Sequence, residues 1–586
     1  MEGKFRFSPR PNRAHEINWR PWGDEAFAVA LVEDKPVFLT IGAVWCQGCH
    51  LMDEAGFSDP EVIRLLNERY IPIRVDADRR PDINERYNRG GWPSNAILTP
   101  AGRVITGGTY IPPEQLRRVL AEVASAWREK RAEFRRAEVK LAGKKPPEVV
   151  PAQVLDLSPY EQTVAALKRA YDPVCYGFGR HAKFPFPHAL ELALHAAHTV
   201  RDEEVLEIAT NSLLAMAGGG MYDVEEGGFF RYCTTRDWTV PQYEKLLGDN
   251  AAVLYVCLQA FQVTGEVRFT DTARDVLSYL ERHLLNPDGT WAGSQDADRE
   301  YYNLPYAQRR RRGAPYIDRT VFTDQNAVLV SALALATWVL EEDQWQRKAV
   351  KTATQLWEKA YREGKGMAHY FESGEPELFG RLSDQAAFGR ACINLYSGTG
   401  DTVWLERSRT LAELCLRELR APGGALYDTK PDPGGIGEMA VPLTSVGENG
   451  LAARWLLELG VLSGDQRYTD AANAALKALV PVFKREGLAG AAFALGVWEV
   501  LHPWTCVTVV GNPKDKRTAL LHRRALAAYA PAKTVRLIPA EGARLLQAAG
   551  IEARKEPCAF VCRGTACYPP VTEPAAMIEL MRPDLA

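Results

Sequence analysis

The pattern of apolar and polar positions first indicates a small α/β unit near the start of the chain. Short apolar runs typical of buried strands alternate with segments that have amphipathic helical spacing. In chain order, this pattern predicts strands at 36–41, 70–76 and 95–99 and helices at 58–66 and 82–88. A charged helix is expected from about 113 to 141. We therefore predict an α/β domain over residues 1–142.

Apolar spacing is helical almost throughout the next part of the chain, up to about residue 500. Proline and polar residues at 143–151 indicate that a linker, residues 143–160, comes first. We predict twelve helices, at 161–171, 188–199, 203–217, 243–263, 267–284, 321–341, 343–362, 384–398, 402–419, 445–462, 466–482 and 488–499. Twelve helices make six hairpins, so residues 161–503 are expected to form one helical domain.

A phrase of glycine followed by an aromatic residue returns between these helices. It occurs at 176–179, 219–223, 227–232, 366–370 and 423–428. A unit repeated about every fifty residues predicts a closed or stacked helical array. Glycine allows tight turns at one end of each hairpin, where we expect the aromatic residues to line a cavity. Plain loop packing is the alternative.

The pattern changes again beyond residue 503. Residues 505–511 and 534–538 are typical of short buried strands, and helices are expected at about 515–528 and 541–549. We therefore predict that residues 504–586 form a small α/β appendage.

Composition bounds the classes of function. A chain of 586 residues is too long for one core, and its net charge of −3 gives no reason to expect a nucleic-acid partner. The arginine run at 309–312 is interpreted as a solvated loop. No apolar stretch is long enough to span a bilayer and the start lacks a signal-peptide core, so no membrane partner and a cytoplasmic location are expected.

The strongest candidate chemistry lies directly after the first predicted strand. Cys46 and Cys49 are separated by two residues, a spacing that can close a disulfide. At a strand-to-helix turn the helix N-terminus favours a thiolate, so Cys46 is the expected nucleophile and Cys49 its resolving partner. The pair with His50 could instead be half of a zinc site, but no second close pair follows at a suitable distance. We favour redox chemistry and predict no metal and no cofactor.

Several blocks around this motif resemble a known family. Residues 57–62, 75–82, 90–93 and 107–113 are similar to blocks of the thioredoxin-like domain of the spermatogenesis-associated thioredoxin-like proteins and their bacterial relatives. The resemblance implies that Pro93 is cis and faces the dithiol, with Trp45 and Trp92 beside it as substrate-binding residues. The family usually carries His-Trp between the cysteines, where this chain has Gln-Gly.

The helical part also resembles this family. Similar blocks occur at 178–185, 240–250 and 294–298, with weaker ones at 318–327 and 382–386. The resemblance implies an (α/α)6 toroid like those of sugar epimerases and six-hairpin glycosidases. The expected fold class is therefore multidomain α/β plus all-α: an N-terminal thioredoxin-like fold, a toroid and a C-terminal α/β appendage.

A toroid pocket would need an acid and a base among aromatic residues to act on a carbohydrate. The candidates are Arg231, Glu244, Asp249, Asp296 and Asp298. The alternative for each carboxylate is a loop or helix-capping role. Gln242 stands where the family usually places an imidazole, and His181, His188 and His369 are interpreted as satisfied core or surface groups.

Most of the eleven cysteines are single residues in apolar helical segments, which is typical of buried thiols in a reducing compartment. Near the C-terminus, Cys562 and Cys567 could form a second disulfide, or exchange with Cys49 if the domains touch. Two buried thiols are the expectation there.

The sequence leaves two main hypotheses for the function. The first is a thiol-disulfide oxidoreductase or redox-sensing protein whose toroid binds a ligand or client. The second is a carbohydrate-active enzyme with a thioredoxin-like regulatory module, and a silent scaffold is a third reading. The partner would be a protein disulfide or a small molecule such as a carbohydrate, and the oligomeric state stays open.

Overall fold

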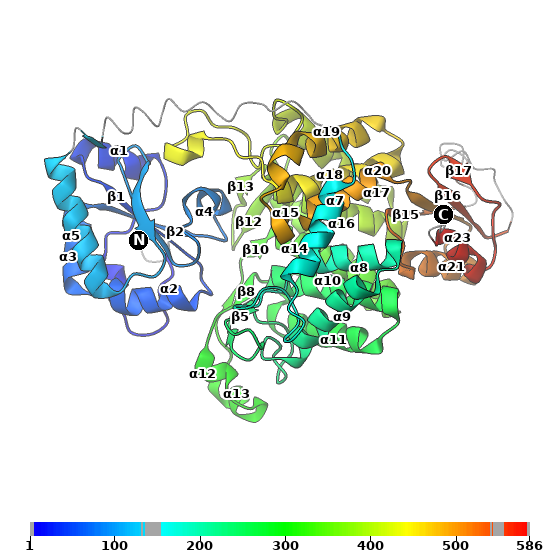
Figure 1. Cartoon of the computed structure of the whole chain (residues 1–586), viewed down its shortest axis with the longest axis horizontal. Helices are drawn as coiled ribbons and strands as arrows, with labels where there is room; N and C mark the ends of the chain where they lie inside the picture. The colour runs from blue at the N-terminus through cyan, green and yellow to red at the C-terminus, as the bar shows by residue number, and fades with distance from the viewer. Residues whose placement is uncertain (1–4, 131–132, 135–153, 540–541, 543–555, 583–586) are drawn as a thin grey trace.

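The protein consists of three bodies placed along its longest axis (Figure 1). The structure is a computed structural model, and it describes residues 5–130, 133–134, 154–539, 542 and 556–582. An α/β domain lies at one end, a helical domain occupies the centre and a second α/β domain lies at the other end. The predicted linker, residues 143–160, falls largely outside the described residues.

The first body has a thioredoxin-like fold around a four-stranded sheet of order β2-β1-β3-β4. Its strands are β1 (Val37–Gly42), β2 (Ile71–Asp76), β3 (Ser94–Leu98) and β4 (Val104–Gly108). β1 runs parallel to β2 and antiparallel to β3. The surrounding helices are α1 (Asp24–Glu33), α2 (Gln47–Leu51), α3 (Pro60–Arg69), α4 (Pro81–Tyr87) and α5 (Pro113–Glu129). The predicted order of strands and helices is therefore confirmed.

Alternation along β1 places apolar side chains on both faces of this sheet. Phe38 joins a core cluster that includes residues of α3 and α5, whereas Leu39 and Ile41 join a second cluster with residues of α1 and α4. Because both faces are covered, β1 is a nearly continuous apolar run, which is why the sequence pattern identifies it.

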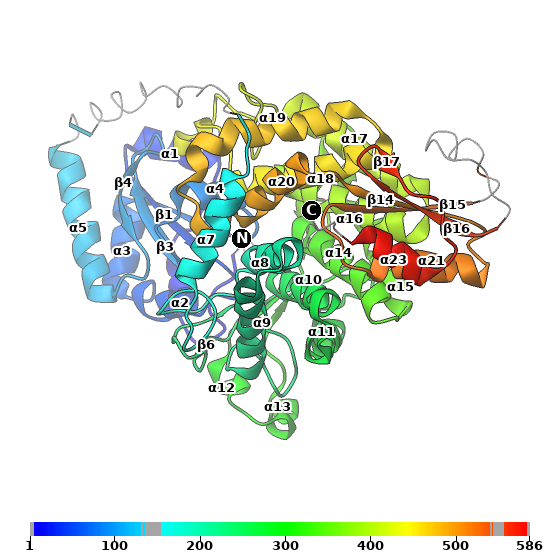
Figure 2. The ribbon, with the colours of Figure 1, turned by 45° about the vertical axis from the view of Figure 1, so that its right-hand side comes forward.

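The central body is a closed ring of helices (Figures 1 and 2). Each inner helix contacts the next, and the sixth contacts the first: α8 (Pro187–Val200), α10 (Leu247–Thr264), α14 (Thr323–Val339), α16 (Leu382–Thr399), α18 (Val446–Ser463) and α20 (Ala491–Leu501). An outer helix packs on each: α9 (Glu203–Gly218), α11 (Val267–Tyr279), α15 (Gln344–Ala360), α17 (Thr402–Glu418), α19 (Gln466–Phe483) and, on α20, α7 (Ser158–Ala170). The predicted (α/α)6 toroid is therefore confirmed, and its sixth hairpin joins the first and last helices.

A repeated side-chain tie fixes the loops to this ring. The fourth residue of α10, α14, α16 and α18 is an amide that hydrogen-bonds both the backbone N–H and the carbonyl of one apolar loop residue. The pairs are Asn250 with Phe229, Asn326 with Trp291, Gln385 with Met367 and Asn449 with Leu426. Each loop residue is at most 2% exposed. The expectation that the aromatic residue of each phrase lines a cavity is therefore wrong for Phe229, which belongs to the core.

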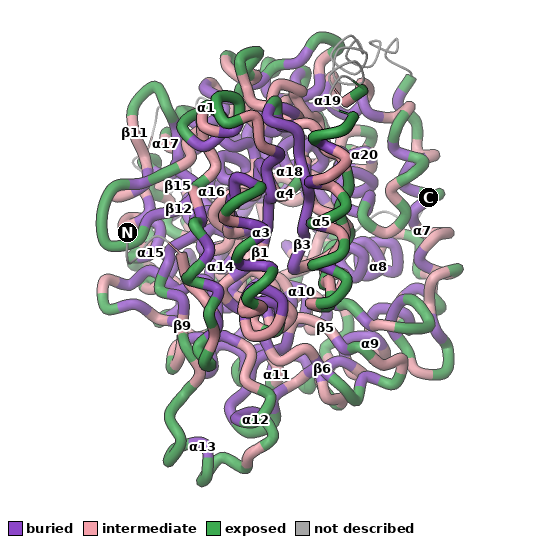
Figure 3. Tube along the Cα trace, turned by 90° about the vertical axis from the view of Figure 1, so that its left-hand side faces the viewer, coloured by how far each residue is buried: buried purple, intermediate pink, exposed green. Residues whose placement is uncertain are grey.

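Burial follows this architecture (Figure 3). Buried residues run along the inner helices and the sheet, and exposed residues lie on the outer loops, including much of the excursion around α12 (Arg299–Tyr302) and α13 (Tyr306–Arg312).

Arg309 contradicts the prediction of a solvated loop at 309–312, because it is buried on α13 and pairs with Asp223 at 2.7 Å and Glu226 at 3.1 Å. Among the described residues, none of the helices combines the length and apolar character needed to cross a bilayer.

The third body is a small sheet of order β15-β14-β16-β17. Its elements are β14 (Thr505–Val510), α21 (Lys516–Ala527), β15 (Lys533–Ile538), β16 (Cys558–Arg563), β17 (Ala566–Cys567) and α23 (Pro574–Met581). The helix expected at 541–549 falls almost entirely outside the described residues.

For the C-terminal cysteines, the disulfide alternative is confirmed and the expectation of two buried thiols is wrong. Cys562 and Cys567 are joined by a disulfide, and Cys567 is exposed, so they are not two buried thiols. Exchange with Cys49 would need the two α/β domains to touch, but they occupy opposite ends of the molecule (Figure 1).

Candidate active site

Cys46 is the residue that caps the N-terminus of α2, directly after β1. Its sulfur accepts a hydrogen bond of 3.1 Å from the backbone N–H of Cys49, and the two sulfurs are joined as a disulfide. When the pair is reduced, the same N–H and the helix dipole stabilise a negative charge on Cys46. The geometry therefore gives the predicted nucleophile and its partner the arrangement that thiol exchange needs.

The loop that carries Pro93 packs directly on this turn. The bond between Trp92 and Pro93 is cis, as expected from the family resemblance. A Cβ atom on Gly48 would lie 3.2 Å from Pro93 Cδ and 3.2 Å from the Trp92 carbonyl oxygen. A side chain at position 48 would require this loop to move by a few tenths of an ångström, so glycine allows the loop to approach the dithiol turn closely.

Trp45 and Trp92 flank the dithiol. Their rings meet edge to face at 5.7 Å between centroids, and the Trp45 indole N–H donates a hydrogen bond of 2.5 Å to Asp78 at the end of β2. Trp45 is only 2% exposed, and Trp92 is half-buried. Both predicted substrate-binding rings therefore stand beside the cysteines.

The helical ring covers the dithiol from the other side. The Arg231 guanidinium lies 4.8 Å above the Trp45 ring and 5.7 Å above the Trp92 ring. Glu244 holds it with an ion pair of 2.6 Å, and Leu246 of β7 (Lys245–Leu246) packs on the cluster that contains both cysteines. Cys46 is consequently only 3% exposed.

Two of the predicted carboxylates lie with Arg231 at this seam. Burial raises the pKa of Glu244, although the charge of Arg231 partly offsets it. Burial also raises the pKa of Asp296 to about 7, against the charge of Arg6, whose guanidinium lies 3.8 Å from Asp296. His50, next to Cys49, lies 3.7 Å from the same carboxylate.

The other two carboxylates have different surroundings. Asp249 lies in the first turn of α10, where burial raises its pKa to about 6 despite the charge of Arg231. Asp298 caps α12 by accepting the backbone N–H of Tyr301 at 3.0 Å, and it pairs with Arg312 at 3.3 Å. The capping alternative therefore describes Asp298, while Arg231, Glu244 and Asp296 are brought to the dithiol.

A cavity of about 690 Å³ lies between the thioredoxin-like domain and the helical domain, beside the dithiol. Its walls come from both domains and include Cys49, His50, Asp76, Arg79, Tyr316 and Tyr370. A smaller hollow of about 300 Å³ adjoins Gln47, His50 and Asp296. The dithiol turn therefore borders a partly open cavity that is large enough for a small molecule.

Asp76 and Asp78 at the end of β2 are site residues that sequence reasoning missed. Burial raises the pKa of Asp78 to about 8 and that of Asp76 to about 6; the charge of Asp318 adds to both shifts, and the charge of Asp76 adds to that of Asp78. In the sequence, both residues lie in the block 75–82 that resembles the family, and they form a repeated acid at the end of a predicted strand.

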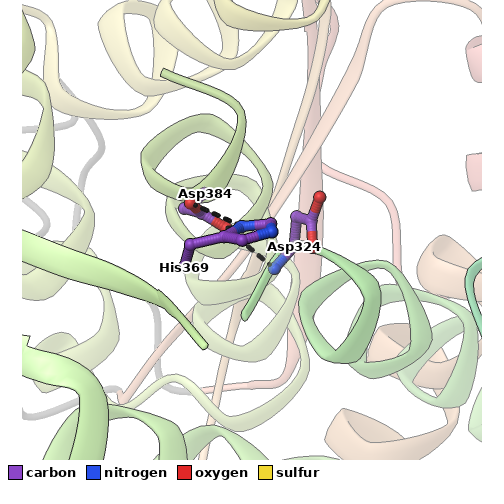
Figure 4. Close-up of side chains that lie close together, drawn as sticks. All are labelled: Asp324, His369 and Asp384. Carbon is purple, nitrogen blue, oxygen red and sulfur yellow. Dashed lines mark hydrogen bonds and ion pairs between the residues drawn. The ribbon is translucent and has the colours of Figure 1, made fainter. Parts of the chain in front are cut away.

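His369 joins the two domains through both of its ring nitrogens. Nδ1 lies 3.0 Å from Asp384, and Nε2 lies 2.7 Å from the backbone carbonyl of Asp78. Asp384 also accepts the backbone N–H of Asp324 at 3.2 Å (Figure 4). Burial opposes protonation of His369, but the charge of Asp384 outweighs it and raises the pKa to about 9. Since a protonated ring donates from both nitrogens, this cluster joins the thioredoxin-like domain to the helical domain.

Further polar contacts hold the thioredoxin-like domain over the end of the ring. Arg79 pairs with Glu372 at 2.6 Å, and Arg381 pairs with Glu85 at 2.6 Å. On the opposite side of α4, the Tyr87 hydroxyl accepts the backbone N–H of Glu438 at 2.8 Å. The enclosed dithiol is therefore maintained by contacts on several sides.

Comparisons with known proteins agree with this architecture. The family model Thioredox_DsbH, described as "Protein of unknown function, DUF255", matches residues 10–144. Spermatogenesis-associated protein 20 of Rattus norvegicus is 34% identical over 312 residues, which cover 48% of this chain and 39% of the rat protein. That match therefore spans well under half of the rat protein. The protein of the same name from Homo sapiens is 24% identical, over 97% of this chain and 90% of the human protein.

Among solved structures, the cellobiose 2-epimerase of Spirochaeta thermophila is similar to part of this chain. It has a TM-score of 0.47 and 15% sequence identity, and the match covers 59% of this chain and 99% of the epimerase. The chain is therefore similar to spermatogenesis-associated protein 20 over nearly its whole length, and its thioredoxin-like domain matches the Thioredox_DsbH family model.

Proposed function

We propose that the protein is a thiol-disulfide oxidoreductase that acts on a small disulfide. The substrate would enter the cavity between the thioredoxin-like domain and the helical domain. The observation that carries the proposal is the position of the pair: Cys46 caps α2 beside the cis Pro93 loop, and Cys49 lines the 690 Å³ cavity. A thiol stabilised by a helix N-terminus and backed by a second thiol is the arrangement that disulfide exchange requires.

The reaction proceeds in two exchanges. The Cys46 thiolate attacks one sulfur of the substrate disulfide and forms a mixed disulfide, while the other substrate sulfur leaves as a thiolate and takes a proton. Cys49 then attacks the Cys46 sulfur, closes the Cys46–Cys49 disulfide and releases the second substrate thiol. Two electrons pass from the dithiol to the substrate, and an external thiol must reduce the pair again.

Enclosure supports a small substrate rather than a protein disulfide. Cys46 is only 3% exposed beneath Arg231 and Leu246, so a polypeptide segment could reach it only by displacing the ring. A small disulfide could instead approach from the cavity that Cys49 and His50 line. The helical ring would then select substrates by size.

The test is reduction of oxidised glutathione and of insulin by the full chain, with dithiothreitol as the electron source. We expect glutathione disulfide to be reduced at least tenfold faster than insulin, and Cys46→Ser to abolish both activities. Cys49→Ser should accumulate a mixed disulfide at Cys46, detected by mass spectrometry. Cys257→Ser, which changes a buried thiol of α10, is the matched control and should leave the rate unchanged. Full activity in Cys46→Ser would contradict the proposal, and equal rates on both substrates would contradict the selection by size.

A carbohydrate-active ring stays a prediction. Its candidate acids are engaged in other contacts, since Glu244 binds Arg231 and Asp298 caps α12. Sugar turnover that survives in Cys46→Ser would support that second reading.

A further inference from the structure

Three cysteines lie in one row across the C-terminal sheet. The strands β14, β16 and β17 are neighbours, and the register places Cys506 opposite Cys562 and Cys562 opposite Cys567. Directly opposite residues of antiparallel strands point to the same face, with Cβ atoms about 5 Å apart. A free thiol therefore stands beside an existing disulfide, because Cys562 and Cys567 are bonded and Cys506 is not.

This row is open to solvent, unlike most of the other free thiols. Cys567 is exposed, and Cys506 and Cys562 are half-buried. By contrast, burial raises the pKa of Cys257 and Cys415 inside the ring to about 12, which leaves those thiols unreactive. The accessible sulfur chemistry of the C-terminal domain is therefore concentrated in these three residues.

We infer that Cys506, Cys562 and Cys567 form a second thiol-disulfide exchange site, separate from the N-terminal dithiol. The Cys506 thiolate attacks the Cys562 sulfur, a Cys506–Cys562 bond forms, and the Cys562–Cys567 bond breaks. Cys567 leaves as a thiolate, and the proton that Cys506 gives up is taken by solvent or by Cys567. The step is an isomerisation, so no net electrons are gained or lost.

The row supplies the alignment that this step needs. Displacement at sulfur proceeds through a nearly linear arrangement of attacking, central and leaving sulfurs, and the three strands present the residues in that order. The consequence is that the free thiol moves from the interior strand β14 to the exposed edge strand β17. There it can react with a low-molecular-weight disulfide or an alkylating reagent.

The test is alkylation of the oxidised, native full chain with N-ethylmaleimide after incubation at pH 8, followed by peptide mapping. We expect one label per molecule within the row, divided between Cys506 and Cys567, and none on Cys562. Cys506→Ser should lower the labelling of Cys567 at least tenfold. The matched control is Cys558→Ser, a change to another thiol of β16, which should leave that labelling unchanged. A Cys46→Ser background excludes reshuffling by the N-terminal pair and should give the same pattern.

Two results would overturn the inference. One is a wild-type protein whose Cys567 stays unlabelled while Cys506 is labelled completely. The other is equal labelling of Cys567 in wild type and Cys506→Ser. A second measurement covers loss of folding in Cys506→Ser: Cys567→Ser, treated with oxidised glutathione, should form a Cys506–Cys562 disulfide, and its failure to form would also overturn the inference.

Discussion

Asp78 is a carboxylate whose surroundings oppose its ionisation. Burial and the neighbouring charge of Asp76 raise its pKa to about 8, and its direct donor is the indole N–H of Trp45. A group with a raised acid pKa holds its proton longer in the folded state than in the unfolded chain. The folded protein therefore loses stability at this residue as the pH rises from about 4 to about 8.

Replacing Asp78 by Asn should stabilise the protein above this range. Asparagine keeps an oxygen for Trp45 but carries no charge, so the gain over wild type should be near zero at pH 4 and grow to on the order of 2 kcal/mol at pH 8. Urea unfolding at a series of pH values measures this difference.

Asp82→Asn is the matched control for this prediction. Burial opposes ionisation of Asp82, but its hydrogen bonds to Arg80 outweigh that effect and lower its pKa. A lowered pKa gives stability that is present above the unfolded value and lost as the pH falls, so Asp82→Asn should destabilise at neutral pH. A gain for Asp78→Asn that did not depend on pH would contradict the assignment.

At the scale of the element, the amide ties decide how loops are held to the inner helices. Asn326 bonds both the N–H and the carbonyl of Trp291, at 2.9 and 3.0 Å, inside the core. Asn326→Ala removes both bonds and leaves two buried backbone groups unsatisfied, so we expect a loss of about 2–4 kcal/mol in the free energy of unfolding. Ser331→Ala on the same helix is the control and should cost less than about 1 kcal/mol, because its hydroxyl only bonds the carbonyl of Ala327 within the helix. Similar losses in the free energy of unfolding for both variants would show that the hydrogen bonds of Asn326 to Trp291 contribute no more than an ordinary side-chain hydrogen bond within a helix.

Local pattern was sufficient to predict most elements but not where α10 begins. Burial on one side imposes a helical period on outer helices such as α11 and α15, whereas inner helices such as α10 and α14 are apolar on most sides and are recognised by the length of their apolar segments. The helix expected from residue 243 starts at Leu247 because residues 241–242 pair with residues 232–233 and residues 245–246 pair with residues 294–295. Such pairing leaves no periodic signal, and it is this irregular stretch that places Glu244 and Leu246 at the dithiol.

At the scale of the whole molecule, His369 connects the stability of the domain arrangement to pH. Its pKa is raised to about 9, above its ordinary value, so its contribution is complete below about pH 6.5 and is lost as the pH rises through about 9. His369→Gln leaves Asp384 buried without its cation, and we expect a loss of about 3 kcal/mol at pH 6 that diminishes by pH 10. The midpoint of urea unfolding and the alkylation rate of the reduced dithiol, which should rise, measure the effect.

His181→Gln is the control for this prediction, since His181 is exposed on the surface of the ring domain. It should change stability by less than about 0.5 kcal/mol at either pH. A loss in His369→Gln that is the same at pH 6 and pH 10 would contradict the charged bridge.

The candidate site could be predicted only in part from the sequence. The motif and the family resemblance indicated Cys46, Cys49 and Pro93, because these residues are adjacent to one strand and its neighbour in the same domain. The position of Arg231 above Trp45 depends on how two domains dock, and the opposition of Cys506 to Cys562 depends on strand register. Neither the docking of the domains nor the strand register can be predicted from the spacing of residues along the chain.

Closure of the ring by its first and last helices affects how the protein is made. The thioredoxin-like domain is complete once α5 has been synthesised, but α7 and α8 wait for α20, the last ring helix to leave the ribosome. A nascent chain therefore carries a folded thioredoxin-like domain linked to an incomplete ring of helices. The helices at the two ends of that incomplete ring each expose an apolar face. Premature termination before α20 would leave those flanks open to aggregation, whereas the same truncation of a linear helical stack would expose only one end.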